Sequence, residues 1–383
     1  MKILSQRFRA AIDYLSAFAG ELDPIVVRPS GRDVIFSATN HAHGEYRCEA
    51  ERPLDMRFAM MMQVPSRLAK LLPDDIVLTI TSGSAATIRF DGGRFICPLH
   101  AMDGIPDPPR VSDGITIEWD ARDMVPELVV AAESAVRGRS WAPKESISIE
   151  VLPARDTIVA TDGRLLSVYH RRVDEGKTSR PPDLEVREMV HRMDVRRIVM
   201  ACRSMGTVRI RSGRSHMLVE CGRRLAIVPL QEVALPSWRE AVKGVREIGK
   251  KGKISVDRDA FIHALRSISP DAEYSSGGIL ISASGREMVM VAGSESDGSV
   301  SRAVVGLQRR CALIPGVFLG AKYLLGVASH WPDLVPLVIE YRGAGRPVVF
   351  ARDRYNAILA PMCFSQIERE RDGDVSTVVT AVG

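Results

Sequence analysis

The sequence predicts an α+β fold in which one domain occurs three times, each copy with two helices and two antiparallel sheets. Three apolar strands end on a proline followed by leucine or methionine, and these prolines, Pro98, Pro229 and Pro361, lie 131 and 132 residues apart. A helical pattern follows a short strand near the start of each copy, and a second helical pattern lies midway through it. Self-similarity at a fixed period is typical of repeated structural units.

The helices are predicted from apolar residues that recur at helical intervals. The first helix of each copy is expected over Met1–Phe18, over Met124–Ala135 after the strand "ITIEW", and over Phe261–Ile268 after the strand "KISVD". The second is expected at Pro65–Leu72, Val195–Met205 and Ala321–Trp331. Runs such as "TVRIRS" and "HMLVECG" alternate apolar and polar residues, which indicates half-buried strands.

The period predicts domains at residues 1–114, 115–247 and 248–364. The first boundary falls in a turn-rich segment near Val111–Gly114, and the second in a basic, glycine-rich segment near Gly244–Lys253. Residues 365–383 form a C-terminal extension that is charged at first and rich in β-branched residues at its end. A flexible extension is the preferred interpretation of this segment.

Composition favours a cytoplasmic protein. The formal net charge is +5, and residues 115–250 carry most of the excess, with 24 basic and 19 acidic side chains. The six cysteines have neither C-x-x-C nor zinc-site spacing, so reduced thiols are expected. No run of about 18 apolar residues predicts a membrane span. No cofactor or metal is expected.

Three motifs in order carry a family resemblance: "VATDGRLLSV", "LPSWREAV" (Leu235–Val242) and "AILAPMCF". With the threefold repeat, they make residues 1 to about 364 similar to the bacterial sliding clamp, the beta subunit of DNA polymerase III. The resemblance implies a head-to-tail homodimer, a ring of six domains around double-stranded DNA that is bound without regard to sequence. It also implies a non-catalytic processivity factor for the replicative polymerase, in which helices line the hole.

In this family, a hydrophobic pocket receives short linear peptides from the DNA polymerase III alpha subunit, the clamp loader, other polymerases and repair proteins. Transferred by position, the resemblance places the pocket at Thr161, Gly163, Arg164, Leu165, Leu166, Pro236, Glu240, Ala241, Pro347, Ile358, Leu359, Ala360, Pro361 and Met362.

The sequence departs from the family pattern at several positions. Arg164, Leu165 and Leu166 stand where a basic residue followed by arginine and leucine is usual. Lys144 replaces an apolar pocket residue, Glu240 replaces arginine, and Ala360 and Cys363 stand in the closing motif for methionine and arginine. A shifted peptide preference is therefore expected. The extension begins beside the predicted pocket, so a regulatory flap over the pocket is the alternative interpretation of residues 365–383.

Basic residues on the predicted helices are candidates for the lining of the hole, because sequence-independent DNA binding depends on contacts with phosphates. These candidates are Arg7, Arg67, Lys70, Arg122, Arg196, Arg197, Arg203 and Arg266, together with Arg137 and Arg139 in the loop "VRGRSW".

Other signals support weaker hypotheses. His41, His43 and Glu45 in "NHAHGEY" could form a metal site, but a hairpin turn is the preferred explanation. Asp162 with His170 could serve a hydrolase, although an aspartate in T-D-G is expected to cap its own turn. A diverged clamp paralogue with altered partners shares the predicted fold and is the alternative to a main replicative clamp.

Overall fold

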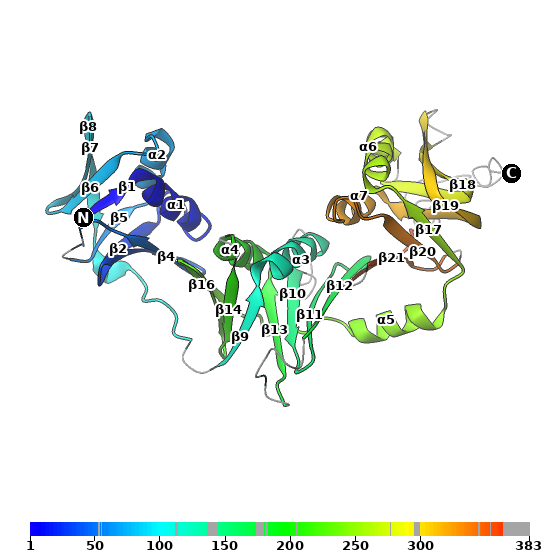
Figure 1. Cartoon of the computed structure of the whole chain (residues 1–383), viewed down its shortest axis with the longest axis horizontal. Helices are drawn as coiled ribbons and strands as arrows, with labels where there is room; N and C mark the ends of the chain where they lie inside the picture. Colours follow the sequence, from blue (N-terminus) through cyan, green and yellow to red (C-terminus); the bar gives the residue numbers. More distant parts are fainter. Residues whose placement is uncertain are drawn as a thin grey trace. The chain divides into compact units, whose positions relative to one another are not determined.

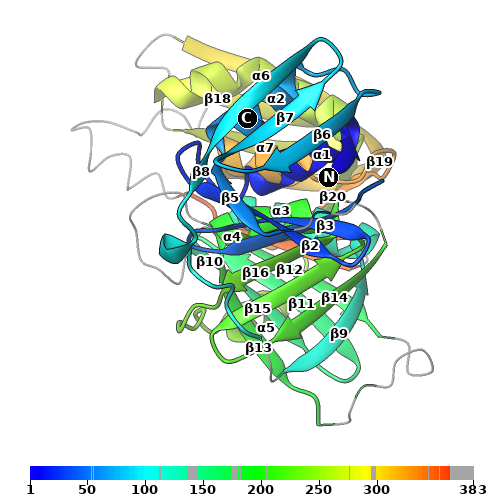
Figure 2. The same ribbon diagram turned by 90° about the vertical axis from the view of Figure 1, so that its left-hand side faces the viewer.

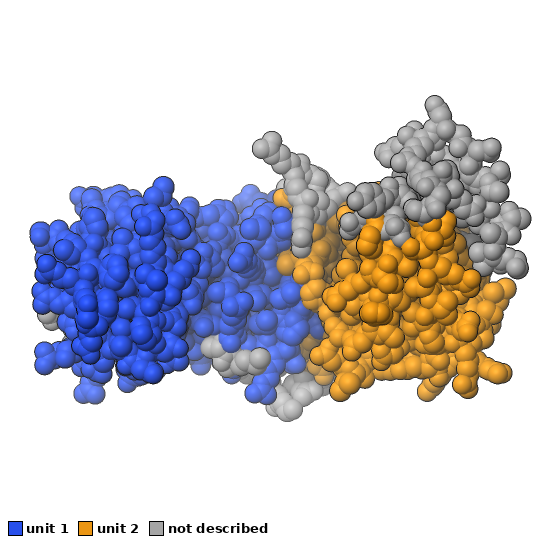
Figure 3. Space-filling view, turned by 90° about the horizontal axis from the view of Figure 1, so that it is seen from above, with its two compact units in different colours: residues 1–129, 188–232 blue, residues 130–187, 233–383 orange. Residues whose placement is uncertain are grey.

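The computed structural model describes residues 1–362 apart from residues 53, 55, 112–113, 136–144, 174–179, 181–182, 204–205, 276, 295–298, 344 and 353. By its internal contacts the chain divides into two compact units, which Figure 3 shows in two colours. The first unit comprises Met1–Val129 and Glu188–Glu232, and the second comprises Val130–Arg187 and Val233–Gly383. The division passes through the predicted middle domain, so the three domain boundaries stay a prediction.

The first unit contains a twelve-stranded antiparallel sheet in the order β1-β6-β7-β8-β5-β2-β3-β4-β16-β15-β14-β9. Figure 2 shows β14, β15 and β16 side by side. The strands are β1 (Lys2–Leu4), β2 (Pro24–Ser30), β3 (Asp33–Thr39), β4 (His43–Glu49), β5 (Phe58–Met61), β6 (Val77–Ser82), β7 (Ala85–Phe90), β8 (Gly93–His100), β9 (Ile115–Asp120), β14 (Thr207–Ser212), β15 (His216–Cys221) and β16 (Arg224–Pro229). The pairing of β16 with β4 joins strands from the first and second predicted repeats.

Helices α1 (Ser5–Leu15), α2 (Gln63–Leu71) and α4 (Arg192–Cys202) belong to this unit, with a short 3-10 helix at Met102–Gly104. Helix α1 packs against β3, β4 and α2, while α4 packs against β15 and β16. Phe8, Ala11, Ile12 and Leu15 are buried, as their helical spacing predicts. The expectation of helix from Met1 is wrong for the first residues, because β1 pairs with β6, Lys2 opposite Thr79.

The second unit contains a ten-stranded antiparallel sheet in the order β13-β10-β11-β12-β22-β21-β20-β17-β19-β18. Its strands are β10 (Ser146–Val151), β11 (Arg155–Thr161), β12 (Leu165–Arg172), β13 (Val186–His191), β17 (Gly252–Val256), β18 (Gly278–Ser294), β19 (Ser299–Gly320), β20 (Leu337–Tyr341), β21 (Val348–Arg352) and β22 (Tyr355–Leu359). Strand β13 is divided between the units, since Val186 and Arg187 belong to the second unit and the residues from Glu188 onward belong to the first. Strands of the second and third predicted repeats meet where β12 pairs with β22.

Helices α6 (Arg258–Ser275) and α7 (Ala321–Ser329) pack against each other and against β19 in this unit (Figure 1). Helix α3 (Ala121–Ser134) begins in the first unit and ends in the second. All six predicted helices are present. Helix α5 (Trp238–Glu247) is additional and was not predicted. No described helix is long and apolar enough to cross a membrane.

Candidate functional site

The turn between β11 and β12 is fixed by its own side chains. One Asp162 carboxylate oxygen accepts hydrogen bonds from the backbone N–H groups of Arg164 and Leu165, both at 2.9 Å. The Thr161 hydroxyl oxygen accepts from the N–H of Gly163 at 3.0 Å. Gly163 has φ +88°, a left-handed conformation that glycine adopts without steric cost. The predicted capping role of Asp162 is therefore confirmed, and the turn is held rigid where β12 begins.

Strand β12 brings the turn next to the end of the chain's last strand. Leu165 lies opposite Leu359 and Leu166 opposite Ile358, and the N–H of Ala360 donates to the Arg164 carbonyl at 2.8 Å. On one face of these strands lies a buried apolar cluster. Its members are Val159, Leu166, Val168, Val349 and Ile358 from the sheet, with Trp238 and Val245 from α5.

Helix α5 is anchored at both ends. Trp238 is only 8% exposed, and its indole N–H donates to a carboxylate oxygen of Glu150 at 3.1 Å. The Arg239 guanidinium lies 4.5 Å from the centre of the Trp238 ring and pairs with the other Glu150 oxygen. Near the other end, buried Arg342 donates to the Val245 carbonyl at 3.0 Å. These contacts hold the apolar side of α5 against the sheet.

Between α5, the turn and the last strand lies an apolar groove of about 260 Å³. It is lined by Thr161, Gly163, Arg164, Leu165, Leu166, Pro236, Ser237, Trp238, Ala241, Val245, Pro347, Ile358 and Ala360. Ten of the fourteen residues expected at a peptide pocket thus line one hollow. An engineered cavity of about 150 Å³ is enough for benzene, so this groove has room for an aromatic side chain.

Four expected residues do not line the apolar groove. Leu359 is fully buried on the opposite face of β22 from Ile358, because side chains alternate along a strand. Glu240 is exposed on α5 and directed away from the cluster. Pro361 follows the strand without reaching the groove, and Met362 lines a neighbouring hollow instead.

Sequence reasoning missed Ser237, Trp238 and Val245 at the groove. A signal was available in the sequence. Trp238, Ala241, Val242 and Val245 have the spacing i, i+3, i+4, i+7 of an amphipathic helix. The residues that α5 contributes could have been found from this stripe.

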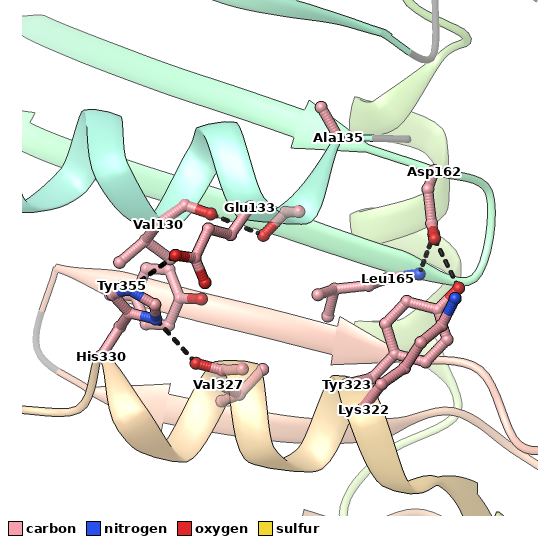
Figure 4. A pocket seen from close by; sticks show the side chains of 12 residues that line it. Val130, Glu133, Ala135, Asp162, Leu165, Lys322, Tyr323, Val327, His330 and Tyr355 are labelled. Carbon is pink, nitrogen blue, oxygen red and sulfur yellow. Dashed lines mark hydrogen bonds and ion pairs between the residues drawn. The ribbon is translucent and has the colours of Figure 1, made fainter. Parts of the chain in front are cut away.

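A second hollow, the polar hollow, lies where α3 and α7 approach the turn (Figure 4). The Tyr323 hydroxyl donates to the second Asp162 oxygen at 2.5 Å, so both carboxylate oxygens are occupied. Burial, and then this hydrogen bond, raise the pKa of Tyr323 well above its ordinary range. Nε2 of His330, the residue that follows α7, lies 3.4 Å from a carboxylate oxygen of Glu133 on α3, and its Nδ1 lies 2.8 Å from the Gly326 carbonyl oxygen.

The helical candidates for DNA contact differ in their exposure. Arg197 pairs with buried Asp194 and donates to the Ala17 carbonyl, and Arg7 pairs with Glu49 at 3.1 Å. The others are exposed and, within the described part of the chain, form no ion pair; they are Arg67, Lys70, Arg122, Arg196, Arg203 and Arg266. Arg137, Arg139 and Lys144 lie outside the described residues.

The two alternative sites are explained by local structure. His43 Nε2 lies 3.1 Å from a Glu45 oxygen and Nδ1 lies 2.7 Å from the Thr39 hydroxyl, beside the predicted hairpin turn between β3 and β4. Among the described residues, no three metal-binding side chains gather. For the hydrolase hypothesis, Leu165 and His170 are five residues apart on extended β12, roughly 16 Å, so Asp162 and His170 lie near opposite ends of this strand.

His170 makes stability depend on pH. Burial, and then the charges of Arg155, Arg246 and Arg239, lower its pKa to about 4 from the ordinary 6.5. The unfolded chain therefore binds more protons between these values, and stability is lost as the pH falls from 6.5 towards 4. After a discount for the solvent-exposed part of the ring, we expect a loss of about 1–2 kcal/mol. Urea unfolding at pH 7.5 and pH 4.5 should show a smaller pH effect in His170→Gln than in the wild type; equal effects would contradict this assignment.

Known proteins resemble this chain in structure and not detectably in sequence. Neither a family model nor a curated protein sequence matches it. The structural match with the DNA polymerase III subunit beta from Pseudomonas aeruginosa covers 94% of this chain and 99% of that protein's chain, with a TM-score of 0.83 at 13% sequence identity. The match with the beta subunit from Thermotoga maritima covers 94% of this chain and 98% of that protein's chain, with a TM-score of 0.80 at 16% sequence identity. A Pseudomonas aeruginosa sliding clamp bound to griselimycin covers 95% and 99%, with a TM-score of 0.82 at 14% identity. The predicted α+β fold is confirmed, and it is the fold of bacterial sliding clamps.

Proposed function

We propose that this chain, which has the sliding-clamp fold, is a non-catalytic processivity factor that encircles double-stranded DNA and tethers a DNA polymerase. The observation that carries the proposal is the apolar groove, where ten residues expected at a partner-peptide pocket converge on one hollow. The bacterial sliding clamps that share this fold align with this chain over almost their whole length. One of them has been solved with griselimycin bound.

The groove suits a short linear peptide. Its lining is mostly aliphatic and aromatic, and Trp238, Leu166 and Ile358 form a preformed floor. Burial of about two large apolar side chains there would contribute roughly 3–6 kcal/mol. We infer that the polymerase alpha subunit, the clamp loader and repair proteins bind here through such segments. Arg164 and Ala360 lie at its rim, where they can contact the peptide backbone or its polar side chains.

A head-to-tail homodimer would complete the ring. Strand β18 ends the ten-stranded sheet, and its partner β19 carries Val300 and Val304, each about half exposed. The open edge of β18 is a ready surface for pairing with a second chain, and the exposed valines of the neighbouring β19 add apolar surface beside it. Closure of a ring would remove such edges, as it does in barrels.

DNA is proposed to be held mainly by topology. Exposed basic residues on α2, α3, α4 and α6 can contact phosphates without reading the bases. Such contacts are individually weak and depend on salt, which permits sliding. A closed ring needs no strong contact to stay on DNA.

The test compares retention on circular and linear DNA. After loading onto a nicked circle by the host's clamp loader, we expect the protein to stay on the circle and to leave rapidly when the same DNA is linearised. Blocking both ends with bulky bound proteins should restore retention. Equal retention on the circle and on free-ended DNA would indicate ordinary electrostatic binding and overturn the proposal.

A further inference from the structure

The chain continues from the wall of the apolar groove towards the extension, residues 365–383. Ala360 lines the groove, and its backbone N–H donates to the Arg164 carbonyl at 2.8 Å. Two residues later, the N–H of Met362 donates to the Phe318 carbonyl at 2.9 Å, and Met362 is the last residue that the structure describes. Because Arg164 lines both the groove and the hollow that Met362 lines, the extension begins beside the groove.

The extension consists of a charged part followed by an uncharged part. Residues 365–374 contain six charged side chains, whereas Val375–Val382, with the sequence V-S-T-V-V-T-A-V, contain none. An uncharged segment that is rich in β-branched residues and has no proline is typical of aggregation-prone sequences. An apolar surface of the same chain would cover these valines and remove that hazard.

The apolar groove is large enough for two of these valines. Its volume is about 260 Å³. A cavity of about 150 Å³ holds one benzene molecule, which has as many carbon atoms as two valine side chains. Because Trp238, Leu166 and Ile358 make the floor apolar, the uncharged part of the extension suits the groove and the charged part does not.

The connection is long enough to bring the uncharged part back to the groove. Val378 follows Ala360 by 18 residues, a stretch that spans at most about 60 Å when it is fully extended. The entropic cost of closing such a loop grows only slowly with its length. Two valines on a free peptide would bind the groove with a dissociation constant on the order of 1 mM. A tethered segment has an effective concentration that is also on the order of 1 mM, so roughly half of the molecules would hold it.

We propose that the uncharged part of the extension, Val375–Val382, binds in the apolar groove of its own chain and competes there with partner peptides. The inference rests on the proposed function, because it adds a competitor to the same groove. A partner peptide binds only when the groove is vacant, so half occupancy by the segment raises the apparent dissociation constant of every peptide about 2-fold. The extension thereby sets the affinity that a partner needs at a given concentration.

The first test measures the affinity of the full chain for a labelled Leu-Phe peptide by fluorescence anisotropy. Val378→Asp combined with Val379→Asp places a carboxylate on each face of the extended segment. We expect the peptide to bind this variant about 2- to 5-fold more tightly than the wild type. Ser365→Asp combined with Gln366→Asp adds the same charge at the start of the extension and should leave the affinity unchanged.

The second test needs no partner peptide. Methyl groups of Val375–Val382 that lie beside the Trp238 ring should show upfield ring-current shifts in NMR spectra of the full chain. Ala241→Arg places a long side chain in the groove and should return these signals to the positions of unstructured valines. Glu240→Arg alters an exposed residue that does not line the groove and should leave the signals shifted.

The outcomes separate this inference from the proposed function. Wild-type valine signals at unstructured positions, or equal peptide affinity of the wild type and the valine variant, would overturn the contact and leave the groove as a peptide site. A shift that grows with protein concentration would assign the segment to the groove of a second copy and overturn binding within one chain. Shifted signals that respond to Ala241→Arg, with no peptide binding by any variant, would support the contact and remove the support for the proposed function.

Discussion

Trp238→Ala is expected to lower the free energy of unfolding by about 3–5 kcal/mol, the usual cost of truncating a buried large aromatic side chain. Trp238 is 8% exposed and packs in the cluster with Leu166, Val245 and Ile358. The change also removes the ring over which Arg239 lies and the indole donor to Glu150. Because this side chain anchors the start of α5, the apolar groove should lose one wall. Urea unfolding followed by far-ultraviolet circular dichroism measures the loss.

Trp238→Phe is the matched control for that variant. It keeps an aromatic ring in the cluster and removes only the N–H group that donates to Glu150. Since one carboxylate oxygen then loses its partner, a smaller loss of about 1–2 kcal/mol is expected. A loss below about 1 kcal/mol in Trp238→Ala would show that α5 is not held by this side chain, and the described anchoring would be wrong.

Ala241→Arg is expected to weaken peptide binding at least about 100-fold, which corresponds to about 2.7 kcal/mol. Ala241 lines the apolar groove from an exposed position on α5, so a long charged side chain can occupy the groove without entering the core. Stability should change by no more than about 0.5 kcal/mol, as is usual for surface substitutions. Fluorescence anisotropy with a labelled Leu-Phe peptide measures the affinity.

Glu240→Arg provides the control, because it introduces the same side chain one position earlier on α5, at an exposed residue that does not line the groove. This variant should retain peptide affinity to within a few-fold. If Ala241→Arg binds as tightly as the wild type, the peptide site must lie elsewhere. If both variants lose binding equally, general positive charge on α5 is responsible and not occlusion of the groove.

The sequence predicts the repeated elements well because their signals are local. The stripe of Phe8, Ala11, Ile12 and Leu15 predicts α1, and alternation predicts β14 and β15. The start of the chain was predicted incorrectly, because Lys2–Leu4 becomes a strand only through pairing with β6, more than 70 residues away. Such pairing leaves no periodic pattern in three residues.

At the site, the sequence predicts which segments meet and not which side chains face the groove. The segment around Ile358–Ala360 was placed there through a family resemblance that gives positions along the chain. Strand alternation then sends Leu359 to the opposite face from its two neighbours. Likewise, Glu240 and Ala241 are adjacent in sequence but only Ala241 lines the groove, because successive residues on a helix point about 100° apart.

The floor of the groove is also part of the protein's core, and this limits how the protein can evolve. Leu166, Trp238, Val245 and Ile358 support the fold and would contact the ligand, so a substitution that adjusts the floor to a new partner also risks the stability of the sheet. Rim residues such as Ala241, Ala360 and Arg164 line the groove but are not part of the buried core, so they can change with less effect on stability. Divergence in partner choice should therefore accumulate at the rim while the floor stays nearly constant, and lineages that exchange partners should differ first in the size and charge of these few rim side chains.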